Sequence, residues 1–394
     1  MTFEIPFGPQ HPALEEPINF MFEIDEERVV NVKLRLGYVH RGIEKIAESR
    51  NYQQLVYLSE RICGICSFAH TLCYSQSVEE LLGLEVPERA KFIRTILAEM
   101  ERIQNHYLWL GLTAKEMGFE TLFMYAWRDR EIIIRMLDMI SGKRVNYGVN
   151  TIGGVRRDIT ESMIGRIEES LKHLEVRAEY YTKVCTKDPL ILRRTVGVGV
   201  LRPREARALC AVGPTARASG IAHDIRADDP YAAYGEIPFK VVTYRGCDVA
   251  SRMYVRIDEI KESIKIIRYA LKNMPDGPIR VRVPILMKVP KGEAVSRVEA
   301  PRGENLHFLK SNGSDKPERW KIRAPTLANL SSLCRMLIGI NLADIPVVIA
   351  GIDPCIACAE RVVLIDSKRD KWKIWNGKDL WRYANEWYRK KYGF

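Results

Sequence analysis

The sequence lacks any run of about 18 apolar residues, the length that a transmembrane helix needs. Its first residues, among them Thr2, Glu4 and Pro6, do not form the apolar stretch of a secretory signal. Internal repeats, low-complexity linkers and DNA- or RNA-binding motifs are also absent. The composition, 46% hydrophobic and 28% charged, is typical of a globular protein. We therefore expect no transmembrane helix and no nucleic-acid partner, so any membrane association must come through partner subunits.

The formal net charge is +11, which means that positive charge is in excess. Such an excess attracts nucleic acid, anionic lipid or an acidic protein. The lysines and arginines are dispersed along the chain, and no nucleic-acid-binding motif accompanies them. An acidic protein partner, or headgroups beside a membrane, therefore explains the charge better than nucleic acid does.

Nine cysteines without a secretory signal indicate a reducing compartment and thiol or metal chemistry in place of a disulfide framework. Four of them form two Cys-x-x-Cys pairs near opposite ends of the chain, Cys63 with Cys66 and Cys355 with Cys358. Cysteines at this spacing can both point at one ion, and thiolate sulfur prefers nickel, iron, zinc or copper. From the spacing alone, a structural zinc site is as good an interpretation as any other.

The hydrophobic periodicity predicts an α+β fold, with a small N-terminal β-sheet region and a core bundle of long helices. Residues 18–40 alternate apolar and polar side chains around a turn at 25–27, which predicts a hairpin. From about Tyr52 the period becomes helical. Helices are expected at 87–118, 120–141, 159–185, 203–211, 251–273 and 326–340. Strands are expected within 279–310, and a Gly-rich loop at 153–158.

We expect three parts: an N-terminal β region (1–50), a helical core with inserted strands (51–361) and a tail (362–394). The tail holds four of the seven tryptophans and many lysines and arginines. Its pattern favours an amphipathic helix that packs on the body of the protein, over an element that lies on a membrane surface. One bundle would bring the distant Cys-x-x-Cys pairs together.

The residues around the cysteines, Glu60–His70 and Asp353–Arg361, resemble the two metal-binding motifs of [NiFe]-hydrogenase large subunits. Arg41–Glu44 is similar to the N-terminal signature of that family, and Glu299–Glu304 to the segment that places an arginine over the metals. The segments Gly8–Pro12 and Gly37–Gly42 are similar to the quinone-site subunit of respiratory complex I. This mixture resembles the membrane-bound, energy-converting (group 4) branch, and the resemblance covers roughly residues 5 to 361.

The resemblance implies that Cys63, Cys66, Cys355 and Cys358 are the ligands of a nickel–iron centre, with Cys66 and Cys358 bridging the two metals. Zinc is disfavoured once the flanking residues are counted. Arg302 would lie above the metals, where a fixed cation can stabilise developing charge or orient a proton. The alternative for Arg302 is an ordinary buried ion pair with a carboxylate.

Glu44 and Glu16 are candidate proton relays toward the site, because burial can raise the pKa of a carboxyl toward neutrality. Glu44 could equally pair with Arg41 or Lys45.

Three further residues, which would not bind a metal themselves, are candidates for orienting the thiolates or Arg302. They are His70, Asp353 and Glu299. His11 and His40 are similar to residues of the complex I quinone cavity. A structural hydrogen bond is the favoured interpretation for both of these histidines.

Two departures from the hydrogenase pattern affect the functional interpretation. Most [NiFe] large subunits are cut after the basic residue of the second motif, here Arg361, whereas this sequence continues for 33 residues. Gly351 stands where a hydroxyl residue that binds the iron's diatomic ligands is expected. On these grounds we expect a sister complex that reduces polysulfide or sulfane sulfur and lacks a working nickel–iron centre. The alternatives are a hydrogen-evolving [NiFe]-hydrogenase and a non-catalytic scaffold subunit.

The resemblance also implies partners. These are a small iron–sulfur subunit that carries a [4Fe–4S] cluster, other peripheral-arm and membrane-arm subunits, and ferredoxin as electron donor. The expected location is the cytoplasmic face of the cell membrane, as a peripheral subunit of a complex that couples electron flow to ion translocation.

Overall fold

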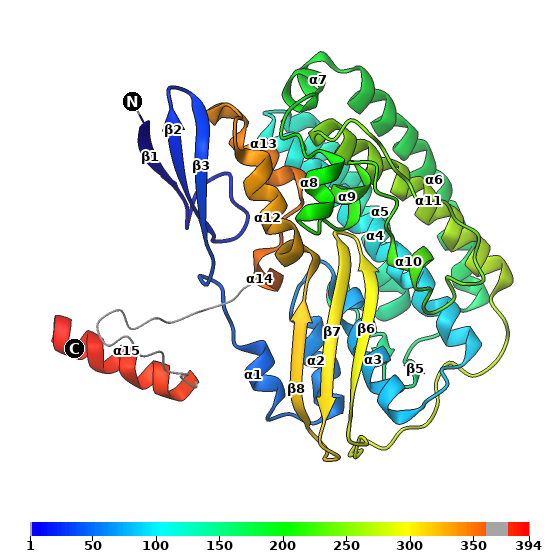
Figure 1. The fold of residues 1–394 in the computed structure, drawn as a ribbon. Helices are drawn as coiled ribbons and strands as arrows, with labels where there is room; N and C mark the ends of the chain where they lie inside the picture. Colours follow the sequence, from blue (N-terminus) through cyan, green and yellow to red (C-terminus); the bar gives the residue numbers. More distant parts are fainter. Residues whose placement is uncertain (1, 360–376, 394) are drawn as a thin grey trace.

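The computed structural model describes residues 2–359 and 377–393 (Figure 1). Its N-terminal part is an antiparallel sheet in the order β1 (Thr2–Phe7), β2 (Asn19–Asp25), β3 (Arg28–Arg35). In β2 the alternating side chains of Phe20, Phe22 and Ile24 are buried, as a half-buried strand requires. The sheet packs through β3 on helix α12 (Pro325–Leu337).

A second antiparallel sheet, in the order β6 (Gly292–Ala300), β7 (Gly303–Ser311), β8 (Pro317–Arg323), lies at the opposite end of Figure 1 from helix α7 (Pro189–Thr195). Helix α3 (Ser67–Leu82) covers β6 and β7. Two shorter helices pack on this unit, α1 (Ile43–Ala47) on β8 and α2 (Tyr52–Glu60) on α3, and other short helices also contact the sheet. The first Cys-x-x-Cys pair, Cys63 and Cys66, lies in the connection between α2 and α3.

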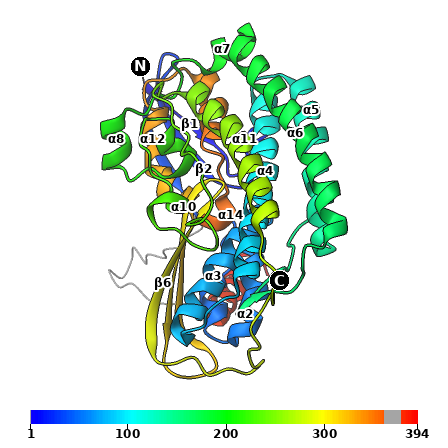
Figure 2. The ribbon, with the colours of Figure 1, turned by 90° about the vertical axis from the view of Figure 1, so that its right-hand side faces the viewer.

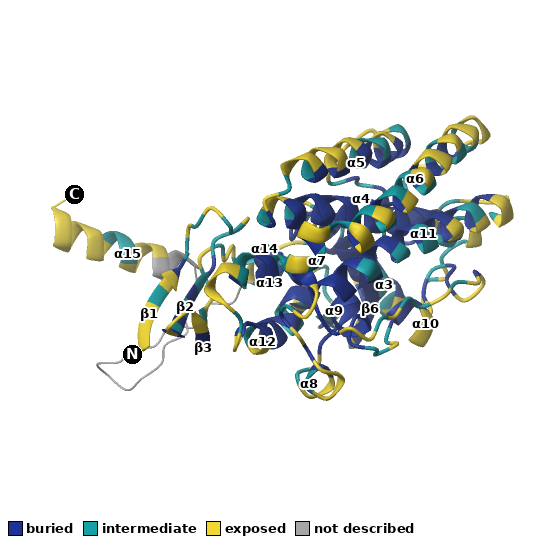
Figure 3. Ribbon diagram, turned by 90° about the horizontal axis from the view of Figure 1, so that it is seen from above, coloured by how far each residue is buried: buried dark blue, intermediate teal, exposed yellow. Residues whose placement is uncertain are grey.

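Four long helices run side by side, and one of them, α4, also contacts α3 (Figure 2). They are α4 (Glu88–Glu116), α5 (Glu120–Ser141), α6 (Glu161–Lys187) and α11 (Val249–Asn273). Helix α4 is the central one, since it contacts α3, α5, α11 and also α13 (Ile345–Gly351). Figure 3 shows α4 almost wholly buried, whereas α5 and α6 expose their outer faces. A polar side chain on α4 must therefore find its partner inside the protein.

The remaining elements are short and connect the long ones. They are the β4 (Asn150–Thr151) and β5 (Gly154–Val155) ribbon, α8 (Pro203–Ala208), α9 (Gly213–Arg217), α10 (Ile225–Asp228), the 3-10 turn η1 (Leu342–Asp344) and α14 (Ile356–Ala359). No helix of the described chain is long and apolar enough to cross a bilayer.

The predicted fold class is confirmed, and the long helices start and end within a few residues of their predicted limits. Local signals explain this agreement: the Asp248 side chain accepts from the Ser251 N–H at the start of α11, and Pro325 occupies the first turn of α12. The strand prediction was less accurate, because β6 begins only at Gly292 and β8 lies beyond 310. Strand β1 was not predicted, and its Pro6 is tolerated because β1 is at the edge of its sheet. The three-part division of the chain stays a prediction.

The expected tail helix exists as α15 (Gly377–Tyr392), while 362–376 lie outside the described residues. Within the described residues of α15, burial against the body is not observed. None of its described side chains is buried, and Trp381 is 70% exposed (Figure 3). The apolar face of the helix comes from aromatic residues whose burial needs a partner surface that the sequence alone could not identify.

Candidate metal centre

The two Cys-x-x-Cys pairs meet in one buried group, which we call the thiol site (Cys63, Cys66, Cys355 and Cys358). Cys63 Sγ lies 3.4 Å from Cys355 Sγ, and Cys355 Sγ lies 3.0 Å from Cys358 Sγ. The sulfurs of Cys63, Cys66 and Cys358 all lie within 4.8 Å of one another. The structure therefore brings the four thiols together, as the two-motif pattern predicts.

Each pair is held at the start of a helix. Cys66 is the N-cap of α3, and Cys355 immediately precedes α14. The N–H groups of Ile65 and Cys66 each donate to Cys63 Sγ at 3.3 Å, and the N–H of Cys355 donates to Thr326 Oγ1 at 3.0 Å. Bonds from the Cys355 thiol and the other thiols hold the pKa of Cys63 well below its usual range. Cys63 is thus stabilised as a thiolate, the form that binds metal.

Arg302 lies at the turn between β6 and β7, beside the thiol site. Its Nη2 donates to Asp353 Oδ1 at 2.8 Å, and its Nε donates to the Asp353 carbonyl at 2.7 Å. Although burial lowers the pKa of Arg302, the charges of Asp353 and the thiols outweigh that effect and raise it well above its usual range. The turn is tight: a Cβ at Gly213 would lie 2.4 Å from the Arg302 carbonyl oxygen, so only glycine fits. Arg302 is therefore both ion-paired, as its alternative interpretation required, and next to the thiols.

Glu16 reaches the thiol site from the loop that follows β1. Its carboxylate accepts from the N–H groups of Ile356 and Ala357, at the start of α14. Burial raises its pKa. Glu16, Arg302 and Cys355 all line one cavity of about 250 Å³, whose other walls are mostly apolar side chains such as Leu108 and Trp109 of α4. A carboxyl that is easily protonated thus lies at the end of an apolar cavity that reaches the thiols.

Helix α4 holds three separate segments of the site with polar side chains that sequence reasoning missed. The 65–69 segment is held by Glu101, which accepts from Phe68 N at 2.7 Å and Ala69 N at 2.9 Å, and by Gln104, which donates to Ile65 O at 2.8 Å. Arg102 donates to Glu299 O at 2.7 Å, and Trp109 donates to Ala350 O at 2.6 Å. With its amide oxygen toward Arg302, Asn105 also accepts from Arg302 and donates to Asp353 Oδ2 at 3.1 Å. The density of polar residues at 99–106 of an otherwise apolar helix was the available signal.

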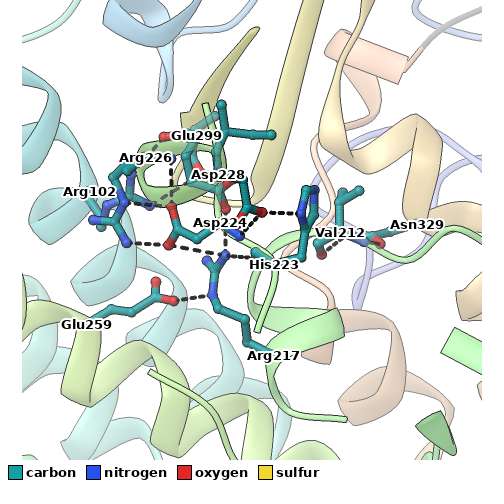
Figure 4. Close-up of polar contacts among 12 residues, drawn as sticks. Arg102, Val212, Arg217, His223, Asp224, Arg226, Asp228, Glu259, Glu299 and Asn329 are labelled. Carbon is teal, nitrogen blue, oxygen red and sulfur yellow. Dashed lines mark hydrogen bonds and ion pairs between the residues drawn. The ribbon is translucent and has the colours of Figure 1, made fainter. Parts of the chain in front are cut away.

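Glu299, expected to orient the thiolates or Arg302, has its side-chain contacts in a different place. It belongs to a buried ionic cluster of Glu99, Arg102, Arg217, Asp224, Arg226, Glu259 and Glu299 (Figure 4). Glu299 Oε1 accepts from Arg217 Nη1 at 2.8 Å, and Oε2 accepts from Ile225 N at 3.2 Å. The Glu299 carboxylate is thus bound to Arg217 and to the start of α10, and its backbone carbonyl accepts from Arg102.

The predicted histidines are dispersed. His70 is buried and pairs with His307 of β7, Nδ1 to Nε2 at 3.1 Å, and burial lowers its pKa to about 4. His11 accepts from the Ala13 N–H at 3.2 Å and stacks on Phe7, with ring centroids 3.8 Å apart. These contacts of His11 are local, and its role stays a prediction. His40 is exposed and lines a second hollow that also reaches Cys358.

Glu44 lines the same hollow as His40. Its carboxylate accepts from Lys321 Nζ at 2.6 Å and from Ile322 N at 3.1 Å, both on β8. Lys45 instead pairs with Glu48, and Arg41 donates to the carbonyls of Arg61 and Ile62. Glu16 thus accepts from the backbone of the segment that bears Cys355 and Cys358, whereas Glu44 lines the hollow that reaches Cys358. A relay role for either residue stays a prediction.

The thiol site has the donor set that a nickel–iron centre requires. Four buried sulfurs converge, and a paired arginine lies beside them. Zinc would be satisfied by the same four thiolates, but a structural zinc site needs neither the cavity nor the acidic and basic residues that reach it.

Comparison with known proteins agrees with this fold and site. Residues 116–286 and 282–361 match the family profile of the respiratory-chain NADH dehydrogenase 49 Kd subunit, and residues 41–112 match that of nickel-dependent hydrogenase. Formate hydrogenlyase subunit 5 of Escherichia coli (strain K12) is 40% identical over 97% of this chain and 67% of its own length. The membrane-bound hydrogenase subunit alpha of Pyrococcus furiosus is 42% identical over 97% of this chain and 92% of its own.

A solved structure, that of the membrane-bound sulfane sulfur reductase (MBS), an archaeal respiratory membrane complex, superimposes with a TM-score of 0.87 at 33% identity. It covers 91% of this chain and 98% of the matched chain. The fold and the thiol site thus define an oxidoreductase subunit of the hydrogenase large-subunit type. The chain belongs to the group 4 membrane-bound [NiFe]-hydrogenase large-subunit family, which is related to the 49 Kd subunit of complex I.

Proposed function

We propose that this chain is the catalytic large subunit of a membrane-bound, hydrogen-evolving complex, in which the thiol site holds a nickel–iron centre. The observation that carries the proposal is the convergence of all four thiols next to the Arg302–Asp353 pair. When bound, the metal group would supply the redox and Lewis-acid chemistry for proton reduction. Glu16 would carry protons to and from the site, and Arg302 would keep a positive charge against it.

The two reasons for expecting a metal-free, sulfur-reducing site carry less weight beside this geometry. The continuation of the sequence past Arg361 bears on processing of the chain and does not alter the arrangement of the four thiols. At Gly351 a Cβ would lie 3.3 Å from Arg252 Nε and 3.4 Å from Val249, so close packing accounts for the glycine.

Sulfane sulfur reduction remains the second candidate function. It is favoured by the similarity to the sulfur reductase complex, which extends over nearly the whole matched chain. In that case the reacting iron–sulfur cluster would belong to a neighbouring subunit and the thiols of this chain would be structural.

In both cases the chain would dock on a small subunit that carries a [4Fe–4S] cluster near residues 61–70, and would receive electrons from ferredoxin. Membrane-arm subunits would couple this electron flow to ion translocation. The expected position is at the cytoplasmic face of the membrane.

The deciding experiment is metal analysis of the purified native complex, together with two activity assays. We expect about one nickel per large subunit and hydrogen evolution from reduced ferredoxin or viologen. Negligible nickel with sulfide production from polysulfide would overturn the hydrogenase proposal and support the second candidate. Cys355→Ala separates them again: it should abolish hydrogen evolution, whereas a sulfur reductase should lose stability more than turnover.

A further inference from the structure

Glu101 differs from most buried acidic residues of this protein because it has no cationic partner. Most of the other buried carboxylates are paired with arginine: Glu60 with Arg61, Glu79 with Arg94, Glu99 with Arg226, Glu259 and Glu299 with Arg217, and Asp353 with Arg302. Asp248 instead accepts from Gly197 N, Ser251 N and Ser251 Oγ. Glu101 is 1% exposed, yet within the described residues no lysine, arginine or histidine lies within ion-pair distance of it. A buried carboxylate without a counter-charge is costly, so the group tends to hold a proton.

The position of Glu101 mirrors that of Glu16 at the other Cys-x-x-Cys pair. Glu101 accepts two backbone N–H bonds in the first turn of α3, just after Cys66. Glu16 accepts two backbone N–H bonds at the start of α14, just after Cys355. Each half of the thiol site therefore has one carboxyl without a basic partner, bound to the first amides of the helix that carries its cysteines.

We propose that Glu101, in addition to Glu16, holds a proton beside the thiol site. The Glu101 carboxyl keeps its proton while the thiol site is negatively charged and releases the proton when that charge is withdrawn. The inference rests on the proposed function in that the site must change its charge during turnover. In the releasing step the carboxyl O–H bond breaks and the proton passes to water, while one electron leaves the site for the iron–sulfur cluster of the partner subunit. The reverse step takes up one proton and one electron.

The surroundings of Glu101 support this role. Burial, as the largest cause, raises its pKa to about 8, against the two N–H bonds from α3, which lower it. The ionisable groups that face it are the Cys63 thiol, Arg102 on its own helix and Tyr147 from the loop after α5. Because Glu101 is bound to the first turn of α3, directly after Cys66, withdrawing negative charge from the thiol site favours release of its proton.

The alternative is that Glu101 only caps α3. The assembled complex is compared as parent, Glu101→Gln, Glu101→Asp and the control Glu79→Gln. Glu79 is a matched control because it too is buried and accepts a backbone bond, from Gly153 N at 2.7 Å, but it is paired with Arg94. Three quantities are measured: the infrared carbonyl band of protonated carboxyl groups against pH, the pH profile of hydrogen evolution, and nickel content.

We expect the parent to show a carboxyl that ionises near pH 8, which Glu101→Gln removes and Glu79→Gln does not. At unchanged nickel content, Glu101→Gln should lower the rate about 100-fold, and Glu101→Asp should move the pH profile. Unchanged infrared bands and pH profile would overturn the proposal, and would leave Glu101 as a cap. If Glu101→Gln does not assemble, Glu101→Asp decides by the same two readouts. Absence of nickel from the parent would instead refute the proposed function, while the infrared band still tests Glu101.

Discussion

The pair Arg302–Asp353 offers a sharp test of the site, through the substitution Asp353→Asn. Asp353 has φ 57°, a left-handed conformation that asparagine tolerates, so the backbone should not change. The new amide oxygen can still accept from Arg302 Nη2. Its amide nitrogen, however, would face the Asn105 nitrogen that now donates to Asp353 Oδ2 at 3.1 Å. Flipping Asn105 would remove this conflict but turn its nitrogen toward the Arg302 guanidinium.

The magnitude follows from burial. Arg302 is 3% exposed and Asp353 is 4% exposed, so solvent does not screen the loss of the counter-charge. Removing one partner of such a buried pair costs about 3–5 kcal/mol. Because the asparagine oxygen keeps one hydrogen bond, we expect the lower end, about 3 kcal/mol. If that energy holds Arg302 in place, hydrogen evolution should fall about 100-fold.

The assay measures hydrogen evolution, nickel content and thermal midpoint of the assembled complex in a double-mutant cycle with Asn105→Asp. The double variant moves the carboxylate from position 353 to position 105, where it can accept both from Arg302 and from the new side-chain amide at position 353. We therefore expect the double variant to recover most of what each single variant loses. Hydrogen evolution close to the parental rate in Asp353→Asn would refute the reasoning. A double variant whose rate and thermal midpoint are no higher than those of the worse single variant would refute it as well.

Three other predictions come from the same kinds of contact. Glu16→Gln should lower hydrogen evolution about 100-fold at unchanged nickel content, whereas equal loss of nickel and rate would reduce Glu16 to a structural role. His106, whose pKa burial lowers to about 4, stays neutral in the folded state. The unfolded chain gains protons below about pH 6.5, so the free energy of unfolding should fall from pH 6.5 toward pH 4, by up to about 3 kcal/mol for this residue. Urea midpoints across that range should show a smaller fall for His106→Gln, and an identical fall would contradict the assignment. Arg217→Met removes a cationic partner of three buried carboxylates (Asp224, Glu259 and Glu299) and should cost at least about 3 kcal/mol in unfolding free energy, with Arg135→Met, on the surface, as a near-neutral control.

Local features of the sequence were enough to predict most helices and the donor set of the thiol site. Helices such as 120–141 were predicted correctly because apolar periodicity and end signals are local properties of the chain. The four cysteines and Arg302 were found because they lie in short sequence motifs that are specific enough to be recognised without the structure.

Which polar side chains serve the thiol site depends instead on how distant segments pack. Periodicity shows that α4 is buried, but it does not tell which segment Glu101 or Asn105 will meet, since their partners lie tens to hundreds of residues away. Glu299 was assigned to the site from its place in a motif, yet its carboxylate turns to Arg217 because a buried charge must join the cations that packing provides. The same reason separates Glu101 from most other buried acids: all glutamates have the same carboxyl group, and only the packed structure leaves this one without an arginine partner among the described residues.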